Sequence, residues 1–125
     1  MKPGTMPNQR DIVLVPIPFT DLTSKRRRPV VVVSNNGYNH KAEDIVVVAM
    51  TSNLNPAAYS FIVTSADLAV GSLKMPSRIR VDKIYTLAQS IVVKKFGQLS
   101  EDSFNRIRQL LSALVGERQE QRTQP

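Results

Sequence analysis

Apolar residues gather along this chain in short runs separated by polar segments. Residues 12–15, 30–33 and 45–50 are apolar throughout, and valine dominates them. Such a run predicts a strand that is covered on both faces, because neither side of its pleat suits contact with water. Three more strands are predicted: a short one over 59–63, a half-exposed alternating one from residue 77, and a last one over 89–99.

Two segments carry the start and stop signals of helices. Residues 65–68 suit the first turn of a short helix, with Ser65 as the N-cap and Gly71 closing it. The clearer helix opens at Ser100, has two acidic residues in its first turn and ends at Gly116. Its apolar stripe comprises Phe104, Ile107, Leu110, Leu111, Leu114 and Val115. Residues 35–43 are predicted to form a turn and a polar connection.

The order of these elements predicts the fold class. A chain of 125 residues has the size of one domain with a single core. Several short strands and a terminal helix indicate a mainly β fold with some α, in which helices pack on a small, strongly curved antiparallel sheet or barrel. We expect a flexible arm over residues 1–9, a folded domain over 10–115 and a disordered tail over 116–125.

Composition excludes several kinds of chemistry. The chain has no cysteine and one histidine, His40, so thiol nucleophiles, disulfides, thiolate metal sites and zinc sites made of several histidines are ruled out. Asp11, Asp44 and Asp82 match no spacing of metal ligands, so we expect neither a metal nor another cofactor. No apolar stretch could span a bilayer and the first residues do not resemble a signal peptide, so a cytoplasmic protein is expected.

The charge of the chain favours an anionic partner. Lysine and arginine exceed aspartate and glutamate by 17 to 10, giving a formal net charge of +7. Nucleic acid is the first candidate partner for such a chain. Lys25, Arg26, Arg27 and Arg28 form the most basic run. A solvated loop is the simple interpretation, but Arg28 precedes Pro29 at the start of a buried strand, where its guanidinium is positioned to bind phosphate.

Polar side chains also follow the strand over residues 45–50. Thr51, Ser52 and Asn53 are either an ordinary polar turn or a set of donors for a phosphate or a base. If the strands over 30–33 and 45–50 pair as an antiparallel hairpin, the start of one lies beside the end of the other. Arg28 and Thr51 would then share one edge of the sheet.

Three further side chains are candidates for contact with nucleic acid. Arg78 and Arg80 point to the same side of the alternating strand, opposite Lys83, and either hold flanking phosphates or are solvated. Phe19 either stacks on an unpaired base or covers the end of the barrel. His40 is expected to be a bystander, because two-histidine ribonuclease chemistry needs a second imidazole.

These residues also carry a resemblance to the MazF/PemK family of toxin endoribonucleases from bacterial toxin–antitoxin pairs. The resemblance spans about residues 10–115. The matching features are Asp11-Ile12-Val13-Leu14-Val15, Phe19-Thr20-Asp21, Arg27-Arg28-Pro29 with the valine run to Ser34, Asn39, Asp44 to Val48, Ala49-Met50-Thr51-Ser52, Asp82-Lys83-Ile84 and Thr86-Leu87.

Membership would imply an SH3-like β-barrel with a C-terminal helix, a homodimer, and control by a separate antitoxin. It would also imply metal-independent cleavage of single-stranded RNA, in which the 2′-OH attacks the adjacent phosphorus and leaves a 2′,3′-cyclic phosphate and a 5′-OH. The catalytic arginine and threonine of the family map onto Arg28 and Thr51. A guanidinium with a pKa above about 12 is a poor proton shuttle. Arg28 is therefore assigned first to stabilising charge on the phosphorane, with proton transfer second.

The resemblance completes the set of predicted site residues. Thr51 would hold a non-bridging phosphate oxygen. The predicted RNA-binding residues are Phe19, Lys25, Arg26, Arg27, Ser52, Asn53, Arg78 and Arg80. Arg10 replaces the glycine usual in the family before Asp11, and the first loop is proline-rich, so the RNA sequence that is cut does not carry over. The alternatives are a DNA gyrase poison on the same fold and a non-catalytic RNA- or protein-binding module.

Overall fold

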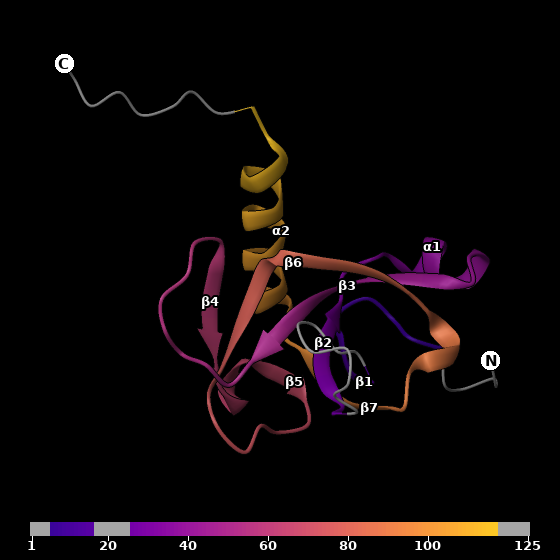
Figure 1. Ribbon diagram of the computed structural model, residues 1–125, viewed down its shortest axis with the longest axis horizontal. Helices are drawn as coiled ribbons and strands as arrows, with labels where there is room; N and C mark the ends of the chain where they lie inside the picture. The colour runs from indigo at the N-terminus through magenta and orange to yellow at the C-terminus, as the bar shows by residue number, and fades with distance from the viewer. Residues whose placement is uncertain (1–5, 17–25, 118–125) are drawn as a thin grey trace.

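The protein folds into one curled antiparallel sheet with a long C-terminal helix, as a computed structural model describes it for residues 6–16 and 26–117 (Figure 1). Within these ranges, seven strands form the sheet in the order β4-β6-β3-β2-β1-β7-β5. The strands are β1 (Asp11–Val15), β2 (Arg28–Val32), β3 (Asp44–Thr51), β4 (Ser60–Val63), β5 (Leu68–Val70), β6 (Ser77–Ala88) and β7 (Lys94–Leu99). The helices are α1 (Asn36–Lys41), α2 (Glu101–Val115) and the 3₁₀ turns η1 (Ser65–Asp67) and η2 (Gln89–Ile91).

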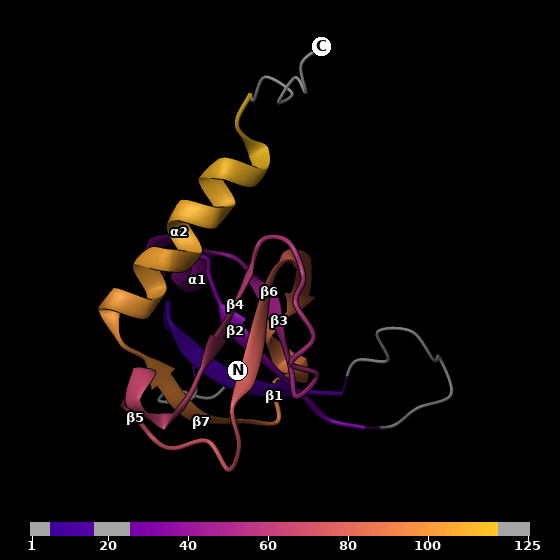
Figure 2. The ribbon, with the colours of Figure 1, turned by 90° about the vertical axis from the view of Figure 1, so that its left-hand side faces the viewer.

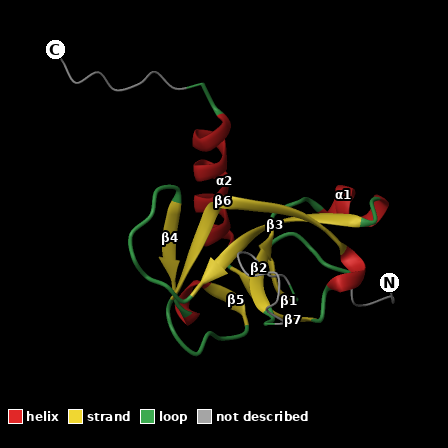
Figure 3. Cartoon of the chain, in the orientation of Figure 1, coloured by secondary structure: helices red, strands yellow, loops and turns green. Residues whose placement is uncertain are grey.

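The predicted fold class is confirmed: the sheet is antiparallel, strongly curled into a half-barrel and followed by the C-terminal helix (Figure 3). Figure 2 shows α2 on one side of this sheet. Among the described residues, no helix is long and apolar enough to cross a membrane. The predicted arm and tail stay predictions, because residues 1–5 and 118–125 lie outside the described ranges.

Apolar side chains pack on both faces of the sheet, as the valine runs predicted. Successive residues of a strand point to opposite faces. We call the side that meets α2 the helix face; its buried cluster includes Ile12, Val31, Val48, Ile79, Val81, Phe104 and Ile107. We call the other side the pocket face; its cluster comprises Val13, Val15, Val30, Val32, Ile45 and Val47.

Strand β6 is the element that curls the sheet over the pocket face. Val48 of β3 pairs with Ile84, whereas the next residue, Ala49, pairs with Arg80. Residues 81–83 are therefore extra on β6, and such a bulge bends a strand and increases its twist. Beyond the bulge, Tyr85 and Leu87 pack against the pocket-face cluster.

Helix α1 forms where the sequence predicted only a turn and a polar connection, so that prediction is wrong. Asn35 is the N-cap, and its Oδ1 accepts a hydrogen bond from the Tyr38 N–H at 2.8 Å. The helix contains glycine and asparagine, which have low helix propensity. A distant side chain supports its end instead: the Gln89 Nε2 donates to the carbonyl oxygen of Asn39 in the helix and to those of Ala42 and Asp44 just after it.

Three other predicted elements differ from the structure. The segment at 65–68 is only the single turn η1, capped by Thr64 rather than Ser65, after which the chain enters β5. Gly71 therefore follows a strand and has a φ of +89°. A Cβ atom added at this position would lie 2.6 Å from the Phe96 carbonyl oxygen. The predicted strand over 89–99 begins instead with η2, and β2 ends at Val32. The residues at which these elements begin and end depend on contacts with distant parts of the chain.

The turn before β1 is held by side chains. Arg10 adopts a φ of 80°, which disfavours residues that carry a Cβ. Its Nη1 donates to the Leu99 carbonyl oxygen at 3.1 Å. The buried Asp11 carboxylate accepts hydrogen bonds from the Asn8 N–H at 2.7 Å and the Gln98 Nε2 at 3.1 Å, and pairs with Lys95 at 3.4 Å. Asp11 is thus a structural residue at the start of β1, which lies inside the sheet.

The predicted long helix is confirmed, with Ser100 as its N-cap and Gly116 as its C-cap. Its predicted apolar stripe is buried only in the first turns. Phe104 and Ile107 lie in the helix-face cluster, and Leu110 and Leu111 pack partly against it, but Val115 is 77% exposed. The last turns of α2 accordingly extend beyond the sheet (Figure 1).

Candidate functional site

A pocket of about 260 Å³ opens on the pocket face, where β2 begins and β3 ends. Thr51 and Ala49 alternate along β3 with residues of the helix-face cluster, so they point to the same side as Val47 and Ile45. The pocket therefore continues the apolar cluster toward the end of the sheet. Its lining residues are Arg28, Ala49, Met50, Thr51, Asn53, Asn55, Pro56, Ala57, Arg78, Arg80, Lys83 and Tyr85.

Arg28 and Thr51 meet in this pocket. Strands β2 and β3 are antiparallel, with Val30 opposite Ala49. Continuing this register by two residues on each strand places Arg28 next to Thr51 on the same face of the sheet. The prediction that both residues share an edge of the sheet is confirmed.

The Thr51 hydroxyl is oriented by the turn that follows it. Its Oγ1 accepts a hydrogen bond from the Asn53 N–H at 3.1 Å, and the Asn53 Oδ1 accepts one from the Asn55 N–H at 2.9 Å. A hydroxyl that accepts in this way keeps its own proton for donation. The polar turn that the sequence allowed is therefore present, and it forms part of the pocket wall.

Arg78 lies directly across the β3–β6 ladder from Thr51. Only 8% of its surface is exposed, so it is not the solvated strand residue that the sequence allowed. Its Nη1 donates to the Ser60 Oγ at 2.8 Å and its Nη2 to the Leu54 carbonyl oxygen at 3.0 Å. Its Nε is buried and has no hydrogen-bond partner in the described part of the chain.

Arg80 is held by a carboxylate. Its Nε donates to the Asp82 Oδ1 at 2.9 Å and its Nη2 to the Oδ2 at 2.8 Å. This hydrogen bonding lowers the pKa of Asp82, against the opposing effect of burial, and raises the pKa of Arg80. Asp82 therefore stays ionised well into the acidic range and balances one of the positive charges beside the pocket.

The pocket as a whole is basic. Four of its lining residues are cationic, namely Arg28, Arg78, Arg80 and Lys83, and none of the described lining residues is acidic. Guanidinium groups and a hydroxyl are the donors that bind phosphate oxygens in proteins. A pocket with these donors can hold one phosphate group and stabilise negative charge that develops on it.

The other predicted RNA-binding residues either lie near the pocket without lining it or fall outside the described ranges. Arg26 and Arg27 are exposed directly before β2, and Ser52 is exposed after β3; none of the three lines the pocket. Phe19 and Lys25 fall outside the described ranges. His40 is exposed on α1, away from the pocket-lining residues, as expected of a bystander.

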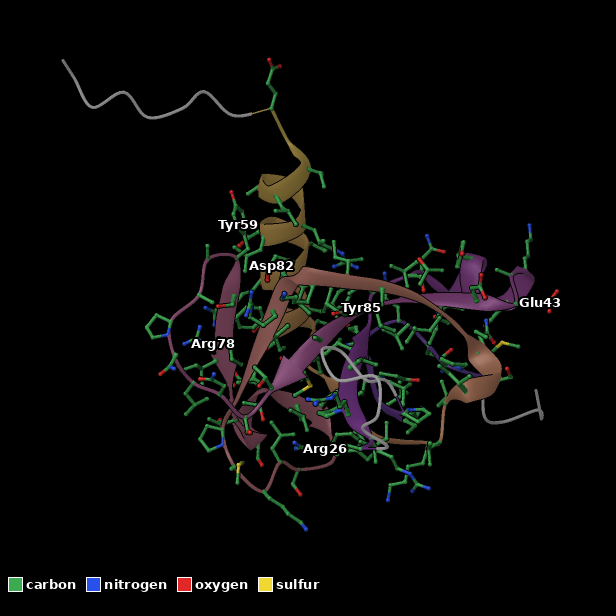
Figure 4. All side chains as sticks on the ribbon, viewed as in Figure 1. Arg26, Glu43, Tyr59, Arg78, Asp82 and Tyr85 are labelled. Carbon is green, nitrogen blue, oxygen red and sulfur yellow. The ribbon has the colours of Figure 1, made fainter. Side chains whose placement is uncertain are left out.

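Sequence reasoning missed Lys83, Tyr85 and Asn55 as pocket residues. Simple alternation along β6 put Lys83 on the face opposite Arg80, and that prediction is wrong because the bulge over 81–83 changes the alternation. Figure 4 shows Arg78, Asp82 and Tyr85 along β6. No local sequence signal marks this bulge. Asn55 could have been found from its place in the turn that begins at Thr51.

The fold and the pocket together define a small curled β-sheet protein with a basic, hydroxyl-bearing pocket. The family model of PemK-like, MazF-like toxins of type II toxin–antitoxin systems matches residues 8–115. The match covers most of the chain, so this protein belongs to that family, as the motifs in its sequence predicted.

Several solved structures share this fold. An endoribonuclease from a mycobacterial species, solved in complex with its cognate antitoxin, is 17% identical with a TM-score of 0.69, covering 91% of this chain and 99% of its own. The Mycobacterium tuberculosis toxin MazF-mt6 is 17% identical with a TM-score of 0.67, covering 83% and 94%. MazF of a Deinococcus radiodurans MazE–MazF structure is 20% identical with a TM-score of 0.68, covering 88% and 96%. No curated protein sequence matches significantly.

Proposed function

We propose that this toxin is a metal-independent, sequence-specific endoribonuclease that cleaves single-stranded mRNA. The observation that carries the proposal is the meeting of Arg28 and Thr51 in a pocket whose charged lining residues are all basic in the described part of the chain. Further support comes from family membership and from similar folds among proteins described as endoribonucleases.

The proposed reaction is an internal transfer at phosphorus. The ribose 2′-oxygen loses its proton and bonds to the adjacent phosphorus, the bond from phosphorus to the 5′-oxygen breaks, and that oxygen gains a proton. The products are a 2′,3′-cyclic phosphate and a 5′-OH. Arg28 stabilises the added negative charge on the phosphorane, and the Thr51 hydroxyl donates to a non-bridging oxygen. Removing one such donor typically raises the barrier by about 2.7–4 kcal/mol.

The other site residues are assigned to RNA binding. Arg26 and Arg27 are exposed beside Arg28, where they can follow the phosphates of the flanking nucleotides. Ser52, Asn53 and Arg80 border the same strand end. Arg78, which the sequence also assigned to RNA binding, forms part of the pocket wall through its bonds to Ser60 and Leu54. Phe19 and Lys25 are assigned from the sequence alone. The expected partners are single-stranded RNA, a second copy of the chain in a homodimer, and a cognate antitoxin whose acidic segment covers the basic pocket.

The test uses purified protein, a long single-stranded RNA and EDTA. We compare the wild type with Arg28→Ala, and use Arg108→Ala as a control that removes the same charge from the exposed surface of α2. Discrete cuts with 5′-OH ends, retained in Arg108→Ala and lost in Arg28→Ala, would support the proposal. RNA that stays intact for several sequences at low salt would overturn it and favour gyrase inhibition or plain binding.

A further inference from the structure

We propose that Arg78 is a positioning residue, which fixes the loop between β3 and β4 so that the Thr51 hydroxyl and the loop amides meet the RNA in one arrangement. The inference rests on the proposed ribonuclease function. It assigns Arg78 a role in turnover and in the selection of the RNA sites that are cut, rather than in direct contact with phosphate.

The first observation is the fork that Arg78 forms between the loop and the sheet. Nη1 donates to the Ser60 hydroxyl at the start of β4, and Nη2 donates to the Leu54 carbonyl oxygen within the loop. These acceptors lie 18 and 24 residues from Arg78 along the chain. A planar guanidinium presents its donors in a rigid fork, whereas the ammonium group of lysine is compact and its three donors rotate.

The second observation is the series of bonds that leads from this fork to Thr51. Leu54 lies between Asn53 and Asn55, whose amides are bonded in turn to the Thr51 Oγ1 and the Asn53 Oδ1. Those bonds span only two residues each, so they shape the loop locally without attaching it to the sheet. Arg78 supplies such an attachment. Through it, the direction of the Thr51 hydroxyl depends on the position of Arg78.

The third observation is that stability alone does not account for Arg78. The side chain is 8% exposed, its Nε is buried without a partner among the described residues, and both of its acceptors are neutral. A buried guanidinium held in this way contributes little net stability, since desolvation offsets the bonds. Imperfectly satisfied polar groups of this kind are expected at functional sites.

The same geometry limits direct phosphate contact by Arg78. Nη1 and Nη2 already donate to the protein, and Nε is not accessible to a ligand. Each Nη keeps a second N–H beyond these bonds, so a phosphate would have to share Arg78 with Ser60 and Leu54 and could not use its Nε–H. The loop wall that these bonds hold in place presents Asn53 and Asn55, whose side-chain amides can read the edges of bases. The expected target of this wall is the nucleotide beside the cut phosphate.

The experiment compares Arg78→Lys, which keeps the charge and loses the fork, with Ser60→Ala. The second variant leaves Arg78 in place but removes one of its acceptors, together with the bond from the Ser60 hydroxyl to the Ala57 carbonyl oxygen. Arg108→Lys on the exposed surface of α2 is the matched control. Three quantities are measured: kcat and KM on a cleaved RNA, the spread of cut sites along a long RNA, and the exchange rate of the Asn53 amide hydrogen by NMR.

We expect Arg78→Lys to lower kcat by about 10- to 100-fold, the size of effect that a small misplacement of reacting groups produces, with little change in KM. Cut sites should become less selective and the Asn53 amide should exchange faster. Ser60→Ala should change all three in the same direction by less, and the double variant should be no worse than Arg78→Lys. Arg108→Lys should match the wild type.

Other results would overturn the inference. A salt-dependent rise in KM at unchanged kcat in Arg78→Lys would assign Arg78 to direct phosphate binding. Unchanged kcat, KM and cut sites would show that Arg78 has no role in the reaction. If Arg78→Lys does not fold, the kcat, cut sites and Asn53 exchange of Ser60→Ala decide whether the inference holds. If the wild type does not cut RNA, the proposed function fails, and Asn53 exchange still decides whether Arg78 fixes the loop.

Discussion

The two faces of the sheet are built from alternate residues of the same strands, yet they differ in what covers them. On the helix face, Val31, Val48 and Ile79 meet Phe104 and Ile107 of α2, and apolar side chains close the contact from both sides. On the pocket face, the valine cluster gives way at the end of the sheet to an open pocket of about 260 Å³.

This difference separates stability from function within single strands. Val48 is buried in the helix-face cluster, whereas Thr51, three residues later on β3, lines the pocket. Burial of apolar area is the main source of folding free energy. Positively charged side chains gathered around a pocket contribute little to it and favour an anionic ligand. Substitutions on the helix face should therefore affect unfolding, and those in the pocket should affect turnover.

The largest expected effect is on the helix face. Phe104 is 1% exposed, and its replacement by alanine leaves a cavity under α2, which should lower the free energy of unfolding by about 3–5 kcal/mol. Chemical denaturation of the wild type and Phe104→Ala measures this change. A loss well below that range would show that α2 is not what seals this face.

The next largest effect is in the pocket and is kinetic. Thr51→Val removes the proposed hydroxyl donor and should raise the activation barrier by about 2.7–4 kcal/mol, which is about a 100- to 1,000-fold loss of kcat. Its free energy of unfolding should stay close to that of the wild type. Thr51→Ser keeps the hydroxyl and is the control. Equal loss in both variants would mean that the hydroxyl does not act in the reaction.

A smaller effect concerns the ion pair of Arg80 and Asp82 beside the pocket. The hydrogen bond from Arg80 lowers the pKa of Asp82 in the folded state. The stabilisation is therefore present above the unfolded pKa of about 3.9 and is lost as the pH falls through the lower folded pKa. Asp82→Asn should cost about 0.2–1 kcal/mol at neutral pH, because the pair is partly exposed.

Denaturation of the wild type and Asp82→Asn at a series of acidic pH values tests this prediction. The gap between the two proteins should narrow as the pH falls below about 4, because the Asp82 carboxylate of the unfolded chain is protonated first. The gap should close once the pH is below the lowered pKa of the folded state. A gap that is constant or that widens toward acidic pH would contradict it.

The smallest effect belongs to the end of α2 that projects beyond the sheet. Val115 is 77% exposed, so Val115→Ala should change the free energy of unfolding of the monomer by no more than about 0.5 kcal/mol. Measurement at low protein concentration checks this value. A large, concentration-dependent loss would instead indicate that Val115 is covered in an oligomer.

The elements that the sequence predicted well depend on local chemistry. Continuous runs of valine indicate strands wherever they lie in the chain, and the caps Ser100 and Gly116 mark the ends of α2 within a few residues. The sequence could predict that Arg28 and Thr51 lie near each other, because one antiparallel pair of strands sets their register. Helix α1 was missed because Gln89, from a distant part of the chain, supports its end by a bond to the Asn39 carbonyl oxygen.

By itself, then, the sequence determined the strand-forming runs, the long helix, the positive charge and the family motifs with Arg28 and Thr51. Each of these depends on residues that are neighbours in the chain or in one hairpin. Only the tertiary structure decided that a bulge turns Lys83 toward the pocket, that Arg80 is held by Asp82, and that Arg78 is bonded to Leu54 and Ser60. The bonds of Arg78 join segments far apart in the chain, and the bulge that contains Asp82 and Lys83 is set by the pairing of β6 with β3. Local propensity carries no information about either.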